Sequence, residues 1–495
     1  MALRLFNTLG RTVQTFIPIE EGKVGVYACG PTVYNFAHIG NLRAYVFEDE
    51  LRRTLEYLGY EVEHVMNVTD VGHLTDDADE GEDKIIRSAR EQGKSVWEIA
   101  DFFTEAFFND VDRLNIRRPT VVCRATAHIQ QMIDLIKRIE DAGYTYHAGG
   151  NVYFDTAKFP NYGELALLDR QQDQESRVEA DPNKKHPRDF VLWFTRSKFE
   201  RQAMVWDSPW GRGYPGWHIE CSAMSMHYLG EHFDIHCGGV DHIPVHHTNE
   251  IAQSEAATGR KWVNYWLHNE FLVMDTGKMS KSKGNFVTLS TLEEEGYEPL
   301  DYRYFLLGGH YQTQLMFTVD AMNGARNARR RLTERITALK EATGMDKPTL
   351  ADVGLSRPVA TSRHGDRTPG AATAAEGATA AAGYLTRFRD AISDNLNVPK
   401  ALAEVWNLLK EGSVPDAQKL AVIIDMDEVF GLGLADAPVS RSIGELPEEV
   451  QELIAQRAQA RKERNFARAD EIRDALRERG ILVEDTPEGT RWKPV

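Results

Sequence analysis

The chain has 495 residues, of which 42% are hydrophobic, and it carries a formal net charge of −17. This length allows more than one domain and a substantial core, whereas no run approaches the roughly 18 apolar residues of a membrane-spanning helix. The mixed polar and apolar N-terminus does not match a secretory signal, and only four cysteines favour a cytoplasmic protein, in which thiols serve metals, catalysis or packing.

The first predicted elements form a strand, a helix and a second strand. Residues 23–29 (KVGVYAC) form a short strand-like run that meets Gly30. A helical pattern of apolar residues begins near His38 and continues to Gly59, and a second strand, 62–68, follows at once. This spacing predicts a βαβ unit and therefore a parallel sheet.

Further strands are predicted much later in the chain. Residues 233–236 and 266–273 have strand-like patterns, with a helix at about 244–258 between them. We therefore expect a sheet built from two separated stretches, with the intervening residues, about 117–220, forming an insertion. Beyond residue 320 the pattern is mainly helical, interrupted at 347–383 by an Ala-, Thr-, Gly- and Pro-rich segment that we interpret as a flexible linker.

The junction between the first strand and its helix carries the sequence HIGN, residues 38–41. Backbone N–H groups and the positive end of the helix dipole would face a phosphate there. Gly40 permits close approach, and His38 can donate to phosphate oxygens. Alone the motif is weak, since a histidine at a helix start is more often structural.

A second motif, KMSKS, occupies residues 278–282. Lys278 and Lys281 on a Ser- and Gly-rich loop suit a mobile clamp that neutralises charge on a leaving pyrophosphate. The alternative is an ordinary solvated basic loop, which we favour for Lys283. Together the two motifs resemble the HIGH and KMSKS sequences of class I aminoacyl-tRNA synthetases, although Asn41 replaces the usual second histidine of HIGH.

Two thiols, an imidazole and a carboxylate form a third group of candidates. Cys29 ends the first strand, Cys221 follows Glu220, and His246 and Glu250 lie four residues apart, on one helical face. Such a set is a plausible tetrahedral zinc site. The alternatives are buried core thiols and a helix-surface His–Glu pair.

Segments along nearly the whole chain resemble cysteinyl-tRNA synthetases. They are FNTLGRTVQTFIP, YACGPTVYNFAHIGN, NVTDVGHL, FVLW, SPWGRGYPGWHIECSAM, FDIHCGGVDHIPVHHTNEIAQSE, NYWLHNEFLVMDTGKMSKSKGN, RYFLLGGHY and DTPEGTRW. The resemblance implies that Cys29, Cys221, His246 and Glu250 hold one Zn²⁺, and that the substrate sulfur coordinates it. His247 is then supporting or structural, and Cys237, where the family often has glycine, is a tolerated small residue.

The resemblance also implies the remaining contacts and the reaction. Thr69, Trp217 and His236 would bind the substrate cysteine, and the ATP site would comprise His38, Gly40, Gly238, Gly239, Asp241 and Lys281. L-Cysteine would attack ATP, accompanied by Mg²⁺, to give cysteinyl-adenylate, with His38, Asn41, Lys278 and Lys281 as catalytic groups. Cysteine would then pass to tRNA(Cys). A cytoplasmic monomer is the expectation.

The implied fold is an α/β, Rossmann-like parallel-sheet catalytic domain split by an insertion, followed by a helical bundle and a small anticodon-binding domain. The expected segments are a first catalytic half (1–116), a connective insertion (117–220), a second catalytic half (221–290), a stem-contact region (291–320), a helical bundle (321–435) and an anticodon-binding domain (436–495). An acidic stretch at 75–83 has no role that we can assign beyond a solvated loop.

Two alternatives remain. A cysteine ligase of the mycothiol-synthesis type activates cysteine identically, but it lacks the synthetases' C-terminal end, which the basic run Arg457–Arg479 and the segment ending in Trp492 resemble. If the chain is a synthetase, Trp492 is a candidate for stacking on an anticodon base. Without that resemblance, a tryptophan near the end of a chain is more often part of the hydrophobic core. A non-catalytic zinc- and RNA-binding protein is the other alternative, and the intact HIGN and KMSKS sequences argue against it.

Overall fold

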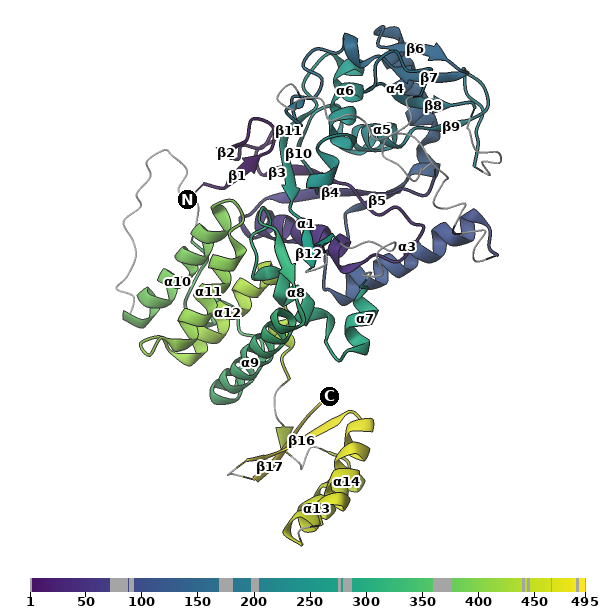
Figure 1. The fold of residues 1–495 in the computed structure, drawn as a ribbon. Coiled ribbons are helices and arrows are strands. Elements are labelled where there is room, and N and C mark those ends of the chain that lie inside the picture. Colours follow the sequence, from purple (N-terminus) through teal and green to yellow (C-terminus); the bar gives the residue numbers. More distant parts are fainter. Residues whose placement is uncertain are drawn as a thin grey trace. The chain divides into compact units, whose positions relative to one another are not determined.

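The computed structural model describes residues 2–71, 88, 93–168, 181–196, 204–274, 277–278, 287–358, 376–438, 441–442, 446–463, 465–486 and 489–494. These residues divide into two compact units (Figure 1). The first is formed mainly by Met1–Arg326 and Phe388–Leu402, and the second mainly by Asn327–Val359 and Ala403–Val495. Within the described ranges, no helix is both long and apolar enough to cross a membrane.

The predicted βαβ unit is confirmed at the N-terminal end of the first unit. Strand β3 (Lys23–Ala28), helix α1 (Ile39–Tyr57) and strand β4 (Glu61–Val68) follow one another, and the two strands pair in parallel. Helix α1 ends before Gly59, whose φ of +97° is a conformation that favours glycine. Its apolar residues are buried against the sheet, so tertiary packing stabilises the helix.

The central sheet has five parallel strands in the order β11-β10-β3-β4-β5. Strands β10 (Phe233–Gly239) and β11 (Val263–Asn269) come from the second stretch, as predicted, with α6 (His246–Thr258) between them. Helices α1 and α3 (Val96–Arg113) cover one face, while α4 (Ile129–Asp141), α5 (Trp217–Leu229) and α6 lie on the other (Figure 1). Helices on both faces of a parallel sheet are the arrangement expected of a Rossmann-like domain.

The expected boundaries of the insertion need correction. Strand β5 (Val121–Arg124) lies inside 117–220, yet it pairs with β4 in the parallel sheet, so the insertion begins after it. The strand has only four residues and is partly exposed, which left little periodic pattern to recognise. At the other end, residue 220 falls within α5, which packs against β3 and β4 and returns the chain to the sheet.

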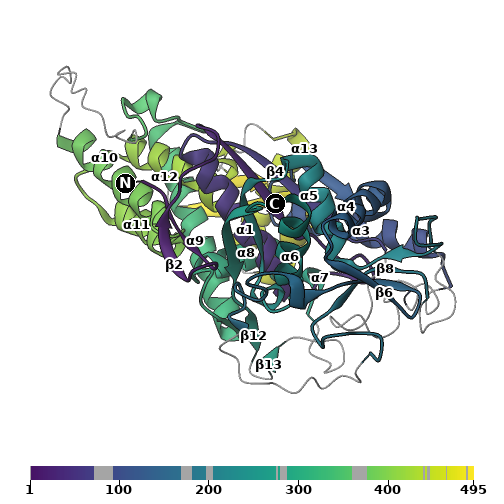
Figure 2. The ribbon, with the colours of Figure 1, turned by 90° about the horizontal axis from the view of Figure 1, so that it is seen from above.

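The insertion itself contains a four-stranded antiparallel sheet. Its strands, in the order β6-β7-β8-β9, are β6 (Thr145–Ala148), β7 (Asn151–Phe154), β8 (Phe190–Phe194) and β9 (Tyr214–Pro215). Aromatic side chains from all four strands or their ends form its core, and in the view from above β6 and β8 lie beside α4 (Figure 2).

The strand predicted at 266–273 is two strands. The chain leaves the parallel sheet after Asn269, because the Glu270 N–H donates to the carbonyl of Tyr311 at 2.8 Å. Strand β12 (Leu272–Met274) then pairs with β14 (Leu315–Phe317) and with β13 (Gly277–Lys278). Two short helices, α7 (Leu289–Glu294) and α8 (Pro299–Leu307), lie between β13 and β14 in sequence. A small two-stranded sheet, β1 (Arg4–Asn7) and β2 (Thr12–Thr15), precedes β3.

The mainly helical structure predicted beyond residue 320 is confirmed, and the described residues between 319 and 430 form four α-helices. They are α9 (Val319–Thr343), α10 (Glu376–Ser393), α11 (Val398–Lys410) and α12 (Asp416–Phe430). The linker expected at 347–383 is too long, because α10 already begins at Glu376 and a short 3₁₀ turn, Ala351–Val353, lies near its other end. Its alanines, which we took as a sign of flexibility, are strong helix formers. Residues 359–375, and the acidic stretch 75–83, lie outside the described residues.

The C-terminal end of the second unit pairs two helices with a small antiparallel sheet. Its elements are β15 (Arg441–Ser442), α13 (Glu448–Lys462), α14 (Phe466–Glu478), β16 (Ile481–Thr486) and β17 (Gly489–Pro494). Trp492 is only 9% exposed and packs in the hydrophobic core with Ile454, Ile472 and Leu476. The base-stacking role expected for Trp492 does not fit this burial, because core side chains cover the ring.

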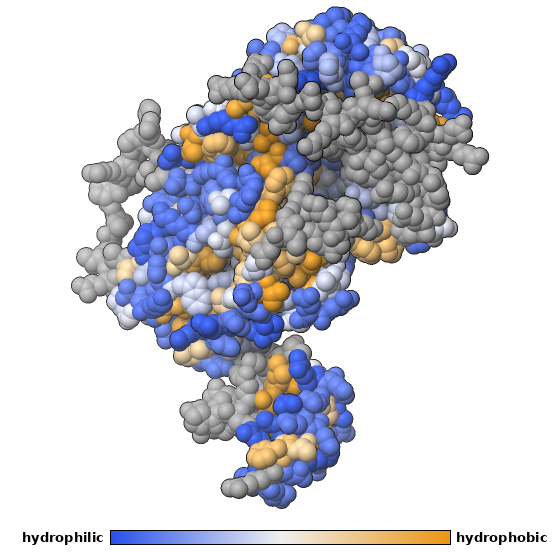
Figure 3. Space-filling model, in the orientation of Figure 1, coloured by the Kyte–Doolittle hydropathy of each residue, from blue (hydrophilic) through white to orange (hydrophobic). Residues whose placement is uncertain are grey.

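Hydrophilic residues cover most of the described surface on the face drawn in Figure 3, with hydrophobic side chains gathered in smaller areas. This surface agrees with the 27% of charged residues in the sequence. The apolar side chains needed for stability are instead concentrated in the sheet and the helices that cover it.

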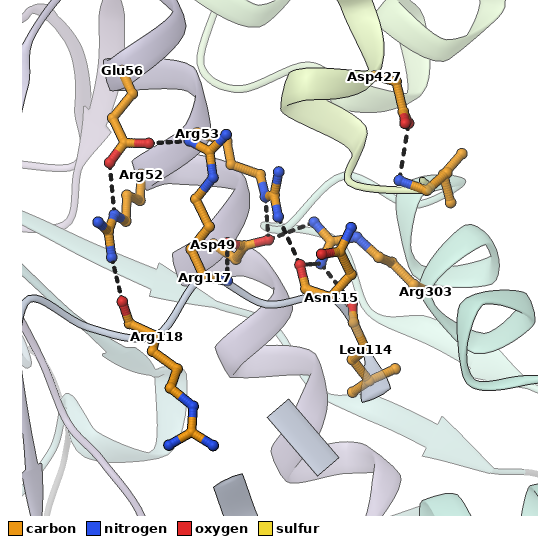
Figure 4. Close-up of polar contacts among 11 residues, drawn as sticks. Asp49, Arg52, Arg53, Glu56, Leu114, Asn115, Arg117, Arg118, Arg303 and Asp427 are labelled. Carbon is orange, nitrogen blue, oxygen red and sulfur yellow. Dashed lines mark hydrogen bonds and ion pairs between the residues drawn. The ribbon is translucent and has the colours of Figure 1, made fainter. Parts of the chain in front are cut away.

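A buried network of charges connects α1 to segments far away in the sequence (Figure 4). The carboxylate of Asp49 accepts from Arg53 at 2.7 Å, from Arg303 of α8 at 2.5 Å and from the Arg117 N–H at 2.9 Å. Arg303 also donates to the carbonyl of Leu114 at 2.9 Å. Burial alone would raise the pKa of Asp49, but the two arginines outweigh burial and hold that pKa below its ordinary value. The network fixes α1 against α8 and the end of α3.

Arg303→Ala should lower the free energy of unfolding of the first unit by about 3–5 kcal/mol, because it removes one partner of a buried ion pair. Arg118→Ala is the matched control: Arg118 pairs with Asp112 on the surface, so its loss should cost no more than about 1 kcal/mol. Urea unfolding followed by tryptophan fluorescence measures both. Equal losses in the two variants would contradict a special contribution of the buried pair.

Candidate active site and metal centre

A cavity of about 410 Å³ lies at the carboxyl ends of the parallel strands. Residues at the ends of β3, β10 and β11 or just after them line it, including Gly30, Gly239 and Asn269, together with the first turns of α1. Strands β3 and β10 are neighbours in the sheet although they come from separate halves of the chain. The cavity therefore lies at the topological switch point, where open α/β sheets bind their ligands.

The HIGN motif forms one wall of this cavity and caps α1. The His38 Nδ1 accepts from the Asn41 N–H at 3.0 Å, and the Asn41 side-chain oxygen accepts from the His38 N–H at 3.2 Å. Through this reciprocal capping box, Asn41 stabilises the start of α1 at the position where HIGH has its second histidine. Because Nδ1 accepts, the neutral ring carries its proton on Nε2, the atom that can donate to a phosphate. His38, Gly40 and Asn41 all line the cavity.

The candidate metal ligands converge beside the cavity. The ligand atoms of Cys29, Cys221, His246 and Glu250 all lie within 4.8 Å of one another, and all four side chains are buried. Cys29 follows β3, Cys221 lies in α5, and the other two lie one turn apart on α6. The predicted set is therefore brought together from three elements that are far apart in sequence.

The contacts within the cluster fit a metal better than a hydrogen-bonded ion pair. Glu250 is 0% exposed, and its Oε1 lies 2.6 Å from the His246 Nε2. Nevertheless, this oxygen has no partner in hydrogen-bonding geometry within the described part of the chain. The other imidazole nitrogen of His246 contacts the His218 Nδ1 at 2.9 Å, and the other Glu250 oxygen contacts the His236 Nε2 at 2.7 Å. Supporting contacts of this kind orient metal ligands.

The electrostatics of the cluster favour the thiolate, the form that binds metals, for one of the two cysteines. A hydrogen bond from Cys29, together with His246, lowers the pKa of Cys221 to about 6 despite its burial, whereas burial raises the pKa of Cys29. Burial would lower the pKa of His246, but the Glu250 carboxylate raises it to about 10. One thiolate beside a cationic imidazole is the charge pattern that a divalent metal would replace.

A second set, Cys29, His236, His247 and Glu250, also has its ligand atoms within 4.8 Å of one another. In this set the His247 Nε2 is 3.3 Å from the Cys29 sulfur, while its Nδ1 contacts the His268 Nε2 at 2.7 Å. The set has only one thiol, and its Glu250 oxygen is already hydrogen-bonded to His236. The first set, with two thiols and an unpartnered carboxylate oxygen, is the better match to zinc.

The residues expected to bind the substrate occupy different positions. The Trp217 side chain lines the cavity, and its ring lies 4.1 Å from the His246 ring, at the wall nearest the cluster. Thr69 and His236 are buried behind the wall and do not belong to the described residues that line the cavity. The Thr69 hydroxyl donates to Glu220 at 3.1 Å. Direct contacts of Thr69 and His236 with a substrate remain predictions.

Glycines form the part of the wall where β10 ends. Gly238, Gly239 and Asp241 line the cavity, as expected of a nucleotide-binding edge. A Cβ at Gly238 would lie 2.6 Å from the His242 Nδ1, so a larger residue would displace that imidazole. Lys278 is described only as part of β13, and Lys281 lies outside the described residues, so their roles stay predictions.

Sequence reasoning missed Glu48, which faces the cavity from α1. Its side chain is 2% exposed, neither oxygen has a hydrogen-bond partner among the described residues, and burial raises its pKa well above the ordinary value. Glu48, Asp49 and Glu50 form an acidic run that would normally be placed on the solvent face of a helix. All three are buried, and Asp49 points to Arg303 of α8.

Comparison with known proteins gives consistent results. Residues 15–327 match the family of class I tRNA synthetase (C) catalytic domains, and residues 444–492 match the cysteinyl-tRNA ligase anticodon-binding domain. A cysteine–tRNA ligase of Treponema denticola is 54% identical over 499 residues, and one of Treponema pallidum (strain Nichols) is 48% identical over 535 residues, each covering 100% of both chains.

Among solved structures, a Mycobacterium tuberculosis methionyl-tRNA synthetase bound by methionyl-adenylate has a TM-score of 0.54 and 16% identity. The match covers 90% of this chain and 96% of that one. At this identity the likeness concerns the fold alone, and it confirms the predicted α/β class.

Asn41→Ala should destabilise the protein by about 1 kcal/mol, because it removes the half of the capping box that accepts from His38. Asn41→Asp should retain the stability, since a carboxylate accepts the same bond and is favoured at a helix N-terminus. Thermal unfolding of the three proteins tests this. A loss of stability in the Asp variant as large as in the Ala variant would show that the capping bond does not account for the stability that Asn41 contributes.

Proposed function

The chain belongs to the cysteine–tRNA ligase family, and from this premise we propose that it activates L-cysteine as cysteinyl-adenylate and transfers it to tRNA(Cys), with zinc selecting the substrate thiolate. One observation carries the proposal: the thiol, imidazole and carboxylate cluster lies beside a cavity that Cys29 and the N-terminus of α1 both line. A sulfur site next to a phosphate site is what cysteine activation requires.

Cys29, Cys221, His246 and Glu250 would hold the zinc. When bound, the metal supplies a coordination position that a thiolate fills far better than a hydroxyl, which separates cysteine from serine. A pocket that relied on shape alone would distinguish such similar substrates by only about 1–3 kcal/mol. His218 and His236 support this set by holding the second nitrogen of His246 and the second oxygen of Glu250.

The nucleotide would occupy the other part of the cavity. Gly238 and Gly239 allow the ATP ribose and adenine to approach the end of β10, and Asp241 offers a carboxylate for the ribose hydroxyls. The triphosphate would lie at the N-terminus of α1, next to His38 and Asn41, where the helix dipole favours anions. Mg²⁺ would accompany ATP, and we assign no side chain to it.

The chemistry would follow from this placement. Trp217 closes the wall beside the zinc ligands and holds the cysteine with its carboxylate toward the α-phosphate. That carboxylate attacks phosphorus, the bond to pyrophosphate breaks, and His38, Lys278 and Lys281 stabilise the charge that develops. The terminal ribose hydroxyl of tRNA then attacks the carbonyl carbon of the adenylate and releases AMP.

Recognition of tRNA(Cys) would also involve the C-terminal domain. Arg468 and Arg473 of α14 are exposed, and each pairs with a neighbouring carboxylate of the same helix. They give a chain of net charge −17 a local surface that can contact phosphates. This domain also argues for tRNA as the acceptor in place of an amino sugar. We propose a cytoplasmic monomer.

Cysteine-dependent exchange of pyrophosphate into ATP tests the proposal directly. We expect exchange with cysteine, at least about 100-fold less with serine, and aminoacylation of tRNA(Cys) but not of an amino sugar. Absence of exchange in folded, zinc-loaded protein would refute the enzyme hypothesis, and transfer to an amino sugar alone would refute the tRNA acceptor.

The metal set has its own test. Cys221→Ser and His246→Ala should lower zinc, measured by plasma mass spectrometry, from about one per chain to a small fraction, since each removes one of four ligands. They should also reduce the preference for cysteine over serine. Cys123→Ser is the matched control, because this buried thiol lies outside the cluster and contacts the Met66 carbonyl. Full zinc in both ligand variants would disprove the assigned set.

A further inference from the structure

Three phenylalanines form a cluster at the rim of the cavity, which we call the rim cluster. Phe36 precedes α1, whereas Phe102 and Phe103 lie on α3. The ring of Phe36 lies 5.9 Å from that of Phe102 and 5.2 Å from that of Phe103, and the two α3 rings are 5.1 Å apart. All three pairs meet edge to face, a favourable arrangement for aromatic rings.

The outer part of the rim cluster is exposed although it has no polar atom. Phe36 is 46% exposed and Phe102 is 41% exposed, while Phe103 is 3% exposed and backs them. Phe107, one helical turn further on, packs 4.7 Å from Tyr45 of α1. The exposed rings therefore rest on a buried base.

The position of the rim cluster restricts what could bind there. Phe36 and Phe103 line the cavity, whereas Phe102 does not belong to the described residues that line it. A ligand that contacts both Phe36 and Phe102 must therefore extend out of the cavity. The proposed function places ATP and cysteine inside, which leaves the rim to a longer molecule that enters the cavity by one end.

A lysine adds charge to this surface. The Lys94 ammonium lies 4.5 Å from the centre of the Phe102 ring, in a cation–π arrangement. Lys94 therefore covers one face of the Phe102 ring. Aromatic rings with a cation close by are the combination by which proteins bind single-stranded nucleic acid, with bases stacked on rings and phosphates near the charge. On a chain of net charge −17, a local cation favours the approach of a polyanion.

We infer that the rim cluster, with Lys94, is a stacking platform for the unpaired nucleotides at the 3′ end of the tRNA. This inference rests on the proposed function, which requires the terminal ribose to reach the adenylate inside the cavity. The unpaired nucleotides before it must then cross the rim. Stacking on Phe36 and Phe102 would hold them there without reading their sequence, because every base has an aromatic face.

A binding cycle tests the inference. The affinities of wild-type protein and Phe102→Ala are measured by fluorescence titration for intact tRNA(Cys) and for the same tRNA lacking its four 3′-terminal nucleotides. The substitution should weaken binding of intact tRNA about tenfold and of truncated tRNA less than twofold. Phe102→Tyr, which keeps the aromatic face, should bind intact tRNA as the wild type does, and Phe102→Leu should behave as the Ala variant.

Trp97→Ala is the matched control, since Trp97 is a 48% exposed aromatic residue on the same helix and no ring contact connects it to the rim cluster within the described residues. It should leave both affinities unchanged. Equal weakening for intact and truncated tRNA, retained affinity in Phe102→Leu, or a tenfold loss in the Trp97 variant would each overturn the platform. Cysteine-dependent pyrophosphate exchange distinguishes failure of the proposed function from failure of this inference. Absence of exchange in the wild type would refute the proposed function, whereas the rim cluster concerns only the tRNA-dependent step.

Discussion

The constraint on which the rest of the structure depends is the burial of ionisable groups around Glu250. A carboxylate that is 0% exposed is costly unless opposite charges or a metal balance it. Here two imidazoles contact its two oxygens at 2.6 and 2.7 Å, and two thiols lie next to them. Because Cys29, Cys221 and Glu250 come from three elements, the cluster can form only when the parallel sheet and the helices on one face are complete.

Another part of the cavity wall is formed by α1, whose N-terminus favours an anion. The proposed function needs donors at the N-terminus of α1 directed at an anion, while the middle of this helix buries the carboxyl groups of Glu48, Asp49 and Glu50. The Asp49–Arg303 pair anchors the helix, and the Ile39 N–H donates to the Val287 carbonyl at 2.8 Å at the cavity end. On the proposed function, a helix held at its N-terminus and in its middle would fix the phosphate site relative to the sulfur site, so that the fold sets the distance between the two.

Local pattern predicted a large part of this arrangement. The βαβ unit, the return of the sheet in a second stretch and the α6 helix were all confirmed, because apolar periodicity and turn residues report on neighbours within a few positions. The i,i+4 spacing of His246 and Glu250 placed both on one helical face, as observed. Two elements were less visible: the short strand β5 joined the sheet, and α10 began within the expected linker.

The sequence by itself determined which residues could carry the chemistry: the HIGN and KMSKS motifs, the thiol, imidazole and carboxylate candidates, and through them the family. Only the tertiary structure decided which of these residues meet. It placed Thr69 and His236 behind the cavity wall, enclosed Trp492 in a core, buried the acidic run of α1 and exposed Phe102 beside Phe36. The physical reason is that a side chain's environment is set by the segments packed against it, and in this protein those segments lie far away along the chain.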